Sequence, residues 1–281
     1  QKDGWGVKIQ YPNDLWTVSA RVNEFGDALE PVLGFLPRPG TRQYELYTAY
    51  QPRPSGGLFA GVRQFFFELD PFLVTDLHGQ TESFRMFMAP LNFRSQAGDH
   101  YEANYAPEYE RLTKPFEIAP GVVIPTGSYQ FHRFRVQVES SDARPISAGA
   151  TAWFGGFYDG HLTQLQGFVN WTEGSGHLQL ALTLENDYGY LPAGNFIFRL
   201  WQLKAVYAFN PDLLLSTFLQ YDSESRDLGL NARLRWTIRP GRDLFVVWNR
   251  GWKHPADARG AELLVSDADQ VILKLRWTFT R

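Results

Sequence analysis

Residues 228–238 read LGLNARLRWTI and alternate strictly between two kinds of side chain. The apolar set is Leu230, Ala232, Leu234, Trp236 and Ile238, and the polar set is Asn231, Arg233, Arg235 and Thr237. Successive side chains of a β-strand point to opposite faces, whereas the faces of a helix repeat every ~3.6 residues. The stretch therefore predicts a β-strand with one apolar face and one basic face.

The same period of two recurs through the chain, in residues 133–139, 178–184, 213–221 and 273–279. Short segments rich in Gly, Pro, Asn and Asp separate the runs, at 158–160, 173–176, 210–212 and 239–242, as hairpins require. We expect longer connections at 23–41, 113–127 and 251–267. With ~10 residues a strand plus its turn, the chain predicts roughly 14–16 antiparallel strands, in a single domain over residues 1–281.

The composition narrows the possible classes. The 281 residues carry a net charge of −3 and 16 % aromatic side chains, at a mean hydropathy of −0.31. A chain of this composition folds, and its charge gives no reason to expect nucleic acid as a partner. The absence of cysteine excludes disulfides and thiol chemistry. No apolar run reaches the ~18 residues that a spanning helix needs.

We favour an antiparallel transmembrane β-barrel over a soluble β-sandwich. Arginines in mid-strand suit a wet lumen, many aromatic residues lie close to predicted turns, and the last strand carries Phe279 ahead of Thr280 and Arg281. Trp and Tyr favour the membrane–water interface, where one edge of the ring is apolar and the other wet. The aromatic residues that we expect at this interface are Trp171, Trp236, Trp248, Trp277 and Phe279.

Basic residues on the polar faces are the candidate lumen-facing residues. They are Arg133, Arg135, Arg233, Arg235, Arg239, Lys274 and Arg276. A cationic wall would select anions, whereas a cross-strand ladder with carboxylates such as Glu139 and Glu185 would neutralise it. We favour the ladder because the charges of the chain nearly balance.

Catalytic and metal-binding patterns are weak. The sequence holds no HExxH, no G-x-S-x-G and no phosphate-binding glycine loop. Two carboxylate pairs, Glu68 with Asp70 and Glu108 with Glu110, have the spacing of one strand face, and solvated carboxylates explain them better than a glycosidase. The acidic loops 222–227 and 267–269 lack the spacing of a Ca²⁺ loop. We expect no enzyme, no cofactor and no metal.

Several short motifs resemble a known family, the uncharacterised outer-membrane β-barrel domain that often follows a family-9-type carbohydrate-binding module. They are residues 34–40 (GFLPRPG), 116–121 (FEIAPG), 124–129 (IPTGSY), 155–160 (GGFYDG), 220–223 (QYDS), 231–236 (NARLRW) and 239–249 (RPGRDLFVVWN). The resemblance implies the outer membrane of a Gram-negative bacterium. Since members of that family carry further strands and a periplasmic module before the first motif, it also implies the C-terminal part of a larger barrel.

The leading functional hypothesis is a channel, a transporter or a membrane anchor, with a saccharide as one candidate solute. A plugged scaffold barrel in a membrane complex is the second hypothesis. A soluble glycan-binding protein or glycosidase is the third. The expected partners are the lipid bilayer and lipopolysaccharide, together with a periplasmic carbohydrate-binding module or other subunits of a membrane complex.

Overall fold

The computed structural model describes residues 2–30, 34, 36, 38–253 and 265–279. Most of the predicted connection 251–267, part of the motif at 34–40, and Thr280 and Arg281 lie outside the described residues. In the described residues, helical structure is limited to one 3-10 turn, η1 (Gly57–Phe59). None of the described residues belongs to a helix long and apolar enough to cross a membrane.

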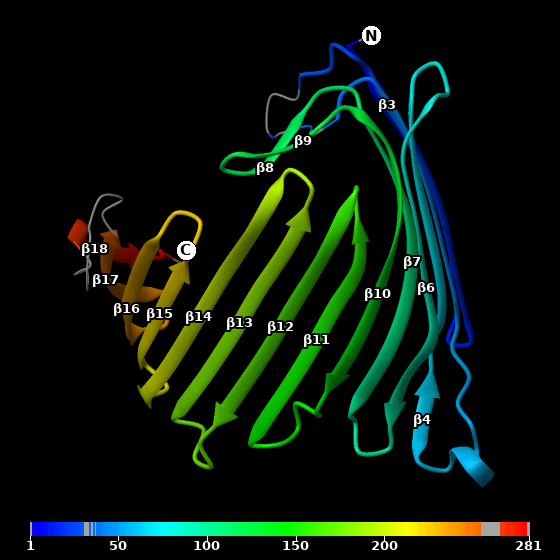
Figure 1. The fold of residues 1–281 in the computed structure, drawn as a ribbon. Helices are drawn as coiled ribbons and strands as arrows, with labels where there is room; N and C mark the ends of the chain where they lie inside the picture. Colours follow the sequence, from blue (N-terminus) through cyan, green and yellow to red (C-terminus); the bar gives the residue numbers. More distant parts are fainter. Residues whose placement is uncertain (1, 31–33, 35, 37, 254–264, 280–281) are drawn as a thin grey trace. The chain divides into compact units, whose positions relative to one another are not determined.

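Strands make up 74 % of the described chain (Figure 1). The first ten are β1 (Gly4–Pro12), β2 (Trp16–Phe25), β3 (Thr41–Tyr50), β4 (Val62–Phe65), β5 (Phe67–Asp76), β6 (Thr81–Ser95), β7 (His100–Leu112), β8 (Phe116–Ala119), β9 (Val122–Ile124) and β10 (Gly127–Glu139). The others are β11 (Ile146–Phe157), β12 (Gly160–Thr172), β13 (Leu178–Leu191), β14 (Gly194–Asn210), β15 (Leu213–Asp222), β16 (Asp227–Arg239), β17 (Arg242–Lys253) and β18 (Val265–Trp277).

Sixteen of these strands form one antiparallel sheet whose spatial order follows the sequence, from β1 to β18. Strand β4 pairs with β6 beside this path, and β8 and β9 form a separate two-stranded hairpin. The prediction of an all-β antiparallel fold is confirmed. The described chain has 18 strands against the roughly 14–16 predicted, and sixteen of them lie in the large sheet. Closure into a barrel and crossing of a membrane stay predictions.

The chain divides into two compact units, and the single-domain prediction stays a prediction. Unit 1 holds the residues up to Glu139, with Thr151–Thr163 and Tyr188–Phe196. Unit 2 holds Ser140–Ala150, Gln164–Asp187 and the residues from Ile197 on. Each unit is described by itself below.

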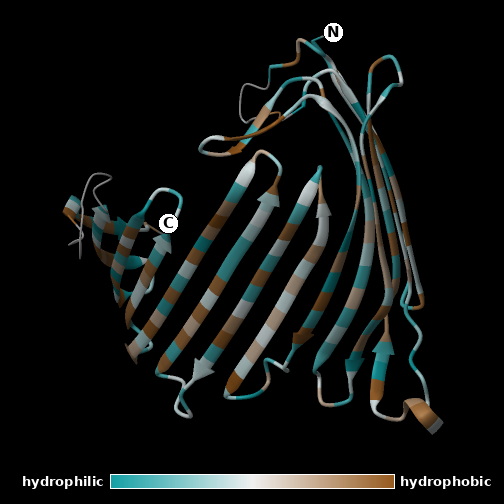
Figure 2. Cartoon of the chain, viewed as in Figure 1, coloured by the Kyte–Doolittle hydropathy of each residue, from teal (hydrophilic) through white to brown (hydrophobic). Residues whose placement is uncertain are grey.

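The alternation in residues 228–238 produces strand β16 as predicted. Leu234 lies opposite Leu215 of β15 and Val246 of β17, so an apolar side chain meets apolar partners on both sides. Arg233 lies opposite Ser216 and Val247 on the other face. Figure 2 shows the alternating brown and teal bands that this period of two gives along the strands.

Two segments differ from the sequence-based expectation. The predicted loop at 113–127 contains the β8–β9 hairpin, whose strands of four and three residues are too short to show alternation. The last strand ends at Trp277, so Phe279 lies beyond it. Its partner β17 begins at Arg242, opposite Trp277, and offers no residue with which Phe279 could pair.

Close approach of two backbones explains the Gly-Gly pair in the motif at 155–160. A Cβ at Gly155 would lie 2.3 Å from the carbonyl oxygen of His132 on β10, and the backbone φ of Gly155 is +130°. Only glycine adopts such a conformation without strain. The pair therefore lets β11 pass close to β10, just before the turn at Tyr158.

Candidate functional site

Between Arg133 and Val138, strand β10 exposes its apolar side chains and buries or half-buries its polar ones. Phe134, Val136 and Val138 are 43 %, 46 % and 47 % exposed, whereas Arg133 and Gln137 are 5 % and 7 % exposed. A strand on the surface of a soluble protein shows the reverse pattern. We call the side with Arg133 and Gln137 the polar face of unit 1, and the opposite side its apolar face.

Strand β7 follows the same pattern. The residues opposite the exposed apolar residues of β10 are Tyr101, Ala103 and Tyr105. On the polar face, Glu102 lies opposite Gln137 and Asn104 opposite Arg135, and both Glu102 and Asn104 are buried. The reversal is therefore a property of neighbouring strands and not of one strand.

An ion pair and its hydrogen bonds hold the buried carboxylate of Glu102. Its Oε1 lies 3.3 Å from Nη1 of Arg135 and accepts a hydrogen bond of 2.8 Å from Nδ2 of Asn104. Its Oε2 lies 3.6 Å from Nε2 of His100. Burial of a charge is costly unless partners of this kind compensate it. Arg135 thus pairs with Glu102, whereas Glu139 lies 3.5 Å from His100 Nδ1. A ladder of such pairs along the strands stays a prediction.

Two aromatic rings bridge over this network. Phe87 of β6 and Trp153 of β11 lie 6.2 Å apart between ring centroids, although β7 and β10 run between their strands. The guanidinium carbons of Arg133 and Arg135 lie 5.9 and 5.6 Å from the centre of the Trp153 ring. Cations favour the negative face of an aromatic ring, and the bridge explains why the polar residues beneath it are shielded.

A hollow of about 400 Å³ lies on the polar face beside this network, and we call it the polar hollow. Its lining combines rings, carboxylates, guanidiniums and an amide. The lining residues are Phe66, Glu68, Phe87, Asn92, Arg94, His100, Glu102 and Arg135. Small-ligand sites of roughly 300–1,000 Å³ have linings of this mixed kind, so the polar hollow is the candidate site.

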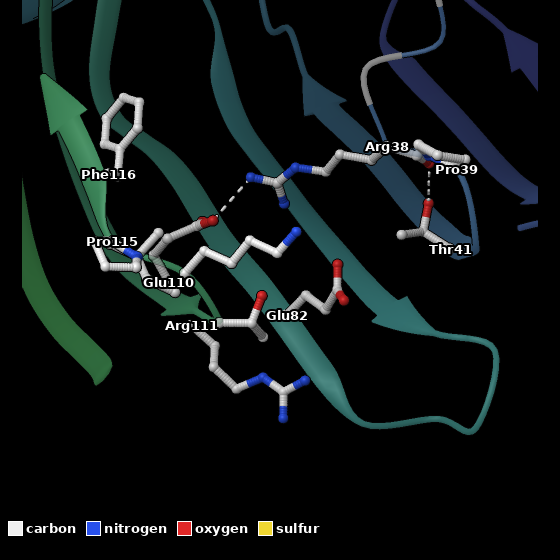
Figure 3. Close-up of a pocket in the computed structure, with 11 residues that line it drawn as sticks. Arg38, Pro39, Thr41, Glu82, Glu110, Arg111, Pro115 and Phe116 are labelled. Atoms are coloured by element: carbon white, nitrogen blue, oxygen red, sulfur yellow. Dashed lines mark hydrogen bonds and ion pairs between the residues drawn. The ribbon is translucent and has the colours of Figure 1, made fainter. Parts of the chain in front are cut away.

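A second hollow of about 340 Å³ lies at the opposite end of β7 (Figure 3). Arg38, which precedes β3, donates hydrogen bonds of 2.8 Å to Glu110 of β7 and 2.7 Å to Ser83 of β6. Arg111 and Glu82 line the same hollow. Arg38 thus fastens the connection that follows β2 to the ends of two strands.

Tyr158, in the turn between β11 and β12, belongs to the same end of unit 1. Burial, the larger cause, and the nearby carboxylate of Glu110 together raise the pKa of its phenol to about 12. The ring packs against Tyr129 and Phe131 of β10, at centroid distances of 5.2 and 5.8 Å. The phenol therefore stays neutral at any physiological pH.

Aromatic rings form a continuous row across the apolar face of unit 1. Consecutive ring centroids lie 4.7, 6.3, 5.6, 5.9 and 5.1 Å apart. In order, the rings are Trp16, Tyr50, Phe67, Phe65, Phe93 and Tyr101. They come from β2, β3, β5, β4, β6 and β7, at the start of some strands and near the end of their antiparallel neighbours, so that all lie along one edge of the sheet. We call them the aromatic row of unit 1.

Unit 2 carries aromatic residues at both ends of its apolar face. At one end Trp201 lies 5.8 Å from Tyr221, and the register continues through Leu228 to Trp252. At the other end Trp236 is 47 % exposed, eight positions along β16 from Leu228. Aliphatic residues fill the strands between these two levels, among them Leu203, Leu215, Leu219, Leu234 and Val246.

One ion pair interrupts the apolar face of unit 2. Arg250 Nη1 lies 4.0 Å from Asp269 Oδ2, and Trp248 Nε1 donates a hydrogen bond of 2.7 Å to Asp269 Oδ1. The guanidinium of Arg250 also lies 5.1 Å from the centre of the Trp252 ring. The pair therefore lies between the level of Trp252, at one aromatic end, and the level of Trp248, which lies opposite Ala232 midway between the two ends.

The predicted basic residues are distributed over both units. Arg133 and Arg135 lie on the polar face of unit 1, as described above. In unit 2, Arg233 and Arg235 project to the face of β16 opposite its leucines, and Arg233 lies 4.8 Å from the Phe245 ring centre. The others of the set are Arg239, at a register shift beside Arg242, Lys274, opposite Phe245, and Arg276, whose Nε lies 3.9 Å from Asp243 Oδ2. That these residues line a lumen stays a prediction.

The predicted interface aromatics are exposed to different degrees. Trp171, Trp248 and Trp277 are 37 %, 36 % and 45 % exposed, and Phe279 is 87 % exposed. Arg242 lies 3.8 Å above the ring centre of Trp277. Trp248 lies opposite Ala232, midway between the two aromatic ends of unit 2 and not at either of them. The position of the others at a membrane surface stays a prediction.

The polar hollow was not predicted as a site. Its signal was present in residues 100–110 (HYEANYAPEYE), where Tyr, Ala and Pro alternate with Glu, Asn and Ala. This pattern predicts a strand with acidic and amide groups on one face. The sequence did not indicate that Phe66 and Phe87 line this hollow, because an isolated phenylalanine suits either face of a strand.

The carboxylate pairs considered for catalysis lie on the polar face. Glu68 lines the polar hollow, and Glu110 lines the second hollow, which also contains Arg38. The described residues contain no group of three or more His, Asp or Glu side chains placed to hold a metal ion. A comparison of the chain with protein-family models, with curated proteins and with solved structures found no match in any of the three. The resemblance to the carbohydrate-binding-module-associated barrel domain therefore stays a prediction.

Proposed function

We propose that the chain forms all or part of an outer-membrane β-barrel of a Gram-negative bacterium. The observation that carries this proposal is the reversed exposure of β10, with half-exposed Phe134, Val136 and Val138 beside a buried Arg133. In water each such apolar side chain forgoes part of the ~1.5–3 kcal/mol that full burial supplies. In a bilayer the same residues contact lipid, and the polar residues face away from it.

The spacing of the aromatic residues supports this orientation. Leu228, which lies between Tyr221 and Trp252, is eight positions from Trp236 on β16. At ~3.4 Å a residue this is about 27 Å along the strand, or about 21 Å across a barrel wall whose strands tilt by ~40°. Outer-membrane barrels carry an apolar band about 25 Å tall between two aromatic girdles. The aromatic row of unit 1 would be part of one girdle.

The polar face then lines an aqueous path, and passage of a polar solute is the leading function. Some of its fixed charges are paired, Arg135 with Glu102 in unit 1 and Arg276 with Asp243 in unit 2. Paired charges give weak selectivity for ionic charge. We therefore propose an unselective or saccharide-passing channel in place of an anion channel, with lipid and lipopolysaccharide around the apolar face.

A plugged scaffold barrel in a membrane complex is a second candidate, favoured by the Phe87–Trp153 bridge. Side chains that span two intervening strands narrow any space above the polar face. Such a barrel would act by anchoring other subunits, and no catalytic role is assigned in either case.

Heat modifiability and conductance test the two candidates. The gene product with its leader is expressed, and the outer-membrane fraction is compared by gel mobility before and after boiling. We expect extraction only with detergent and faster migration of the unboiled sample. Purified protein in a planar bilayer then separates a channel, which gives unitary current steps, from a plugged barrel, which gives none. Recovery without detergent, with unchanged mobility, would leave a soluble β-rich glycan-binding protein as the function.

A further inference from the structure

We propose that the polar hollow of unit 1 is a binding site for a neutral saccharide. This proposal rests on the proposed function, because the solute reaches the hollow through the aqueous path. The hollow draws its lining from β5, β6, β7 and β10 and from Phe66, between β4 and β5. Its ligand class follows from the charge, the hydrogen-bonding groups and the rings of that lining.

The formal charges of the lining cancel. Glu68 and Glu102 supply two negative charges, and Arg94 and Arg135 supply two positive ones. An anion would meet the two carboxylates and a cation the two guanidiniums, so either would pay a repulsion that a neutral molecule does not. Moreover, Glu102 and Arg135 already neutralise each other at 3.3 Å. The site therefore favours a ligand without net charge.

Unused hydrogen-bonding capacity marks the same surface. Nε of Arg135 is buried without a hydrogen-bond partner in the described chain, as are Oδ1 of Asn104 and Oε1 of Gln137 just beneath. Asn104 and Gln137 are themselves more than nine-tenths buried. The Arg94 side chain is exposed, and its guanidinium has no hydrogen bond or ion pair to the rest of the described chain. Buried polar atoms without partners, such as those of Arg135, Asn104 and Gln137, are rare, and a bound water or ligand is one explanation for them.

Hydroxyl groups match this surface better than any single charged group. A hydroxyl both donates and accepts, so a ring that carries several of them satisfies guanidinium donors and carboxylate or amide acceptors side by side. Here Arg94 and Arg135 donate, and Glu68, Glu102 and Asn92 accept. A polyhydroxylated molecule thus uses both halves of the lining at once.

The rings Phe66 and Phe87 add an apolar surface to the hollow. The face of an aromatic ring carries partial negative charge and attracts the positively polarised edges of C–H groups. A pyranose presents such C–H groups on one face and hydroxyls around its edge. Rings together with paired donors and acceptors therefore select a saccharide over a small polar solute without an apolar face.

Equilibrium binding to the folded protein tests the site. The protein is held in a zwitterionic detergent without sugar groups, and maltose is titrated while its saturation-transfer NMR signals are followed. We expect saturable binding that weakens roughly tenfold in Arg94→Gln, which loses a charged donor, and several-fold in Phe66→Leu, which loses a ring but little volume. Arg63→Gln is the matched control, because Arg63 is an exposed arginine of neighbouring β4 outside the lining.

Each outcome decides the proposal. Saturable maltose binding that is lost in Arg94→Gln and Phe66→Leu but kept in Arg63→Gln supports it. Absence of saturable binding overturns it, as does equal weakening in all three variants. Displacement of maltose by sodium glutamate at equal concentration would assign the hollow to charged solutes instead. A preparation that is heat-modifiable and conducts current but does not bind maltose refutes the site alone, whereas recovery without detergent refutes the proposed function.

Discussion

Replacement of Ala232 by arginine would place a charge midway between the two aromatic ends of unit 2. Ala232 lies on the apolar face of β16, opposite Thr217 of β15 and Trp248 of β17, and four positions from both Leu228 and Trp236. If this face contacts lipid, an arginine near the bilayer midplane costs about 2–4 kcal/mol. A desolvated cation–π contact with Trp248 offsets about 2 kcal/mol, which leaves a net cost of up to about 2 kcal/mol.

Gly229→Arg is the matched control on the same strand. Gly229 lies on the opposite face, and a Cβ there meets no atom within 4 Å, so the new side chain has room. On the polar face the arginine remains in water, so we expect the free energy of unfolding of the Gly229→Arg protein to differ from that of the unaltered protein by less than ~0.5 kcal/mol.

Urea titration of the protein folded in lipid vesicles measures both variants. The free energy of unfolding follows from the midpoint and slope, with folded and unfolded fractions read from gel mobility before boiling. If Ala232→Arg destabilises no more than Gly229→Arg, the apolar face does not contact lipid, and the membrane orientation proposed here is wrong.

Two further predictions concern unit 1. Gly155→Ala places a Cβ 2.3 Å from the His132 carbonyl oxygen, at a backbone φ of +130°. We expect this substitution to lower the urea midpoint of unfolding by an amount equivalent to about 1–3 kcal/mol. Gly174→Ala is the control, because a Cβ there has open space around it, and it should leave the midpoint within error. Arg53 Nη2 donates a 2.8 Å hydrogen bond to Asp14 Oδ1, and this bond lowers the pKa of Asp14 below its ordinary 3.8. The stability from this pair is present above pH 3.8 and is lost as the pH falls through the lower folded value. Pepsin should therefore cleave the connection 51–61 faster in this acid range, and Asp14→Asn should remove this pH dependence; an unchanged dependence in that variant would contradict the role of the pair.

The sequence predicts strands and faces well because both follow from local alternation. Leu230 to Trp236 keep their predicted face in β16, and Arg133 and Arg135 share a face of β10. The β8–β9 hairpin was missed because strands of three or four residues carry too little alternation to detect. Phe279 fell outside its predicted strand because the end of a strand depends on its neighbour, and β17 begins only at Arg242.

The candidate site depends on information that alternation does not contain. Periodicity indicates that Arg135 and Glu102 lie on polar faces, but their pairing depends on the register between β7 and β10, which the intervening hairpin separates in sequence. The contact between Phe87 and Trp153 depends on how the sheet bends, because it spans two intervening strands. Composition and period could not have revealed either of these features.

Since the strands of the sheet follow one another in space as they do in sequence, the architecture is modular. Most strands pair with the strands just before and after them, so the register of each hairpin is set within a segment of a few dozen residues. A duplication or deletion of one hairpin in the middle of the gene would leave the other pairings intact and change the strand number by two. Chains of this type can therefore diverge in size during evolution without the rerouting of connections that an interleaved sheet would require.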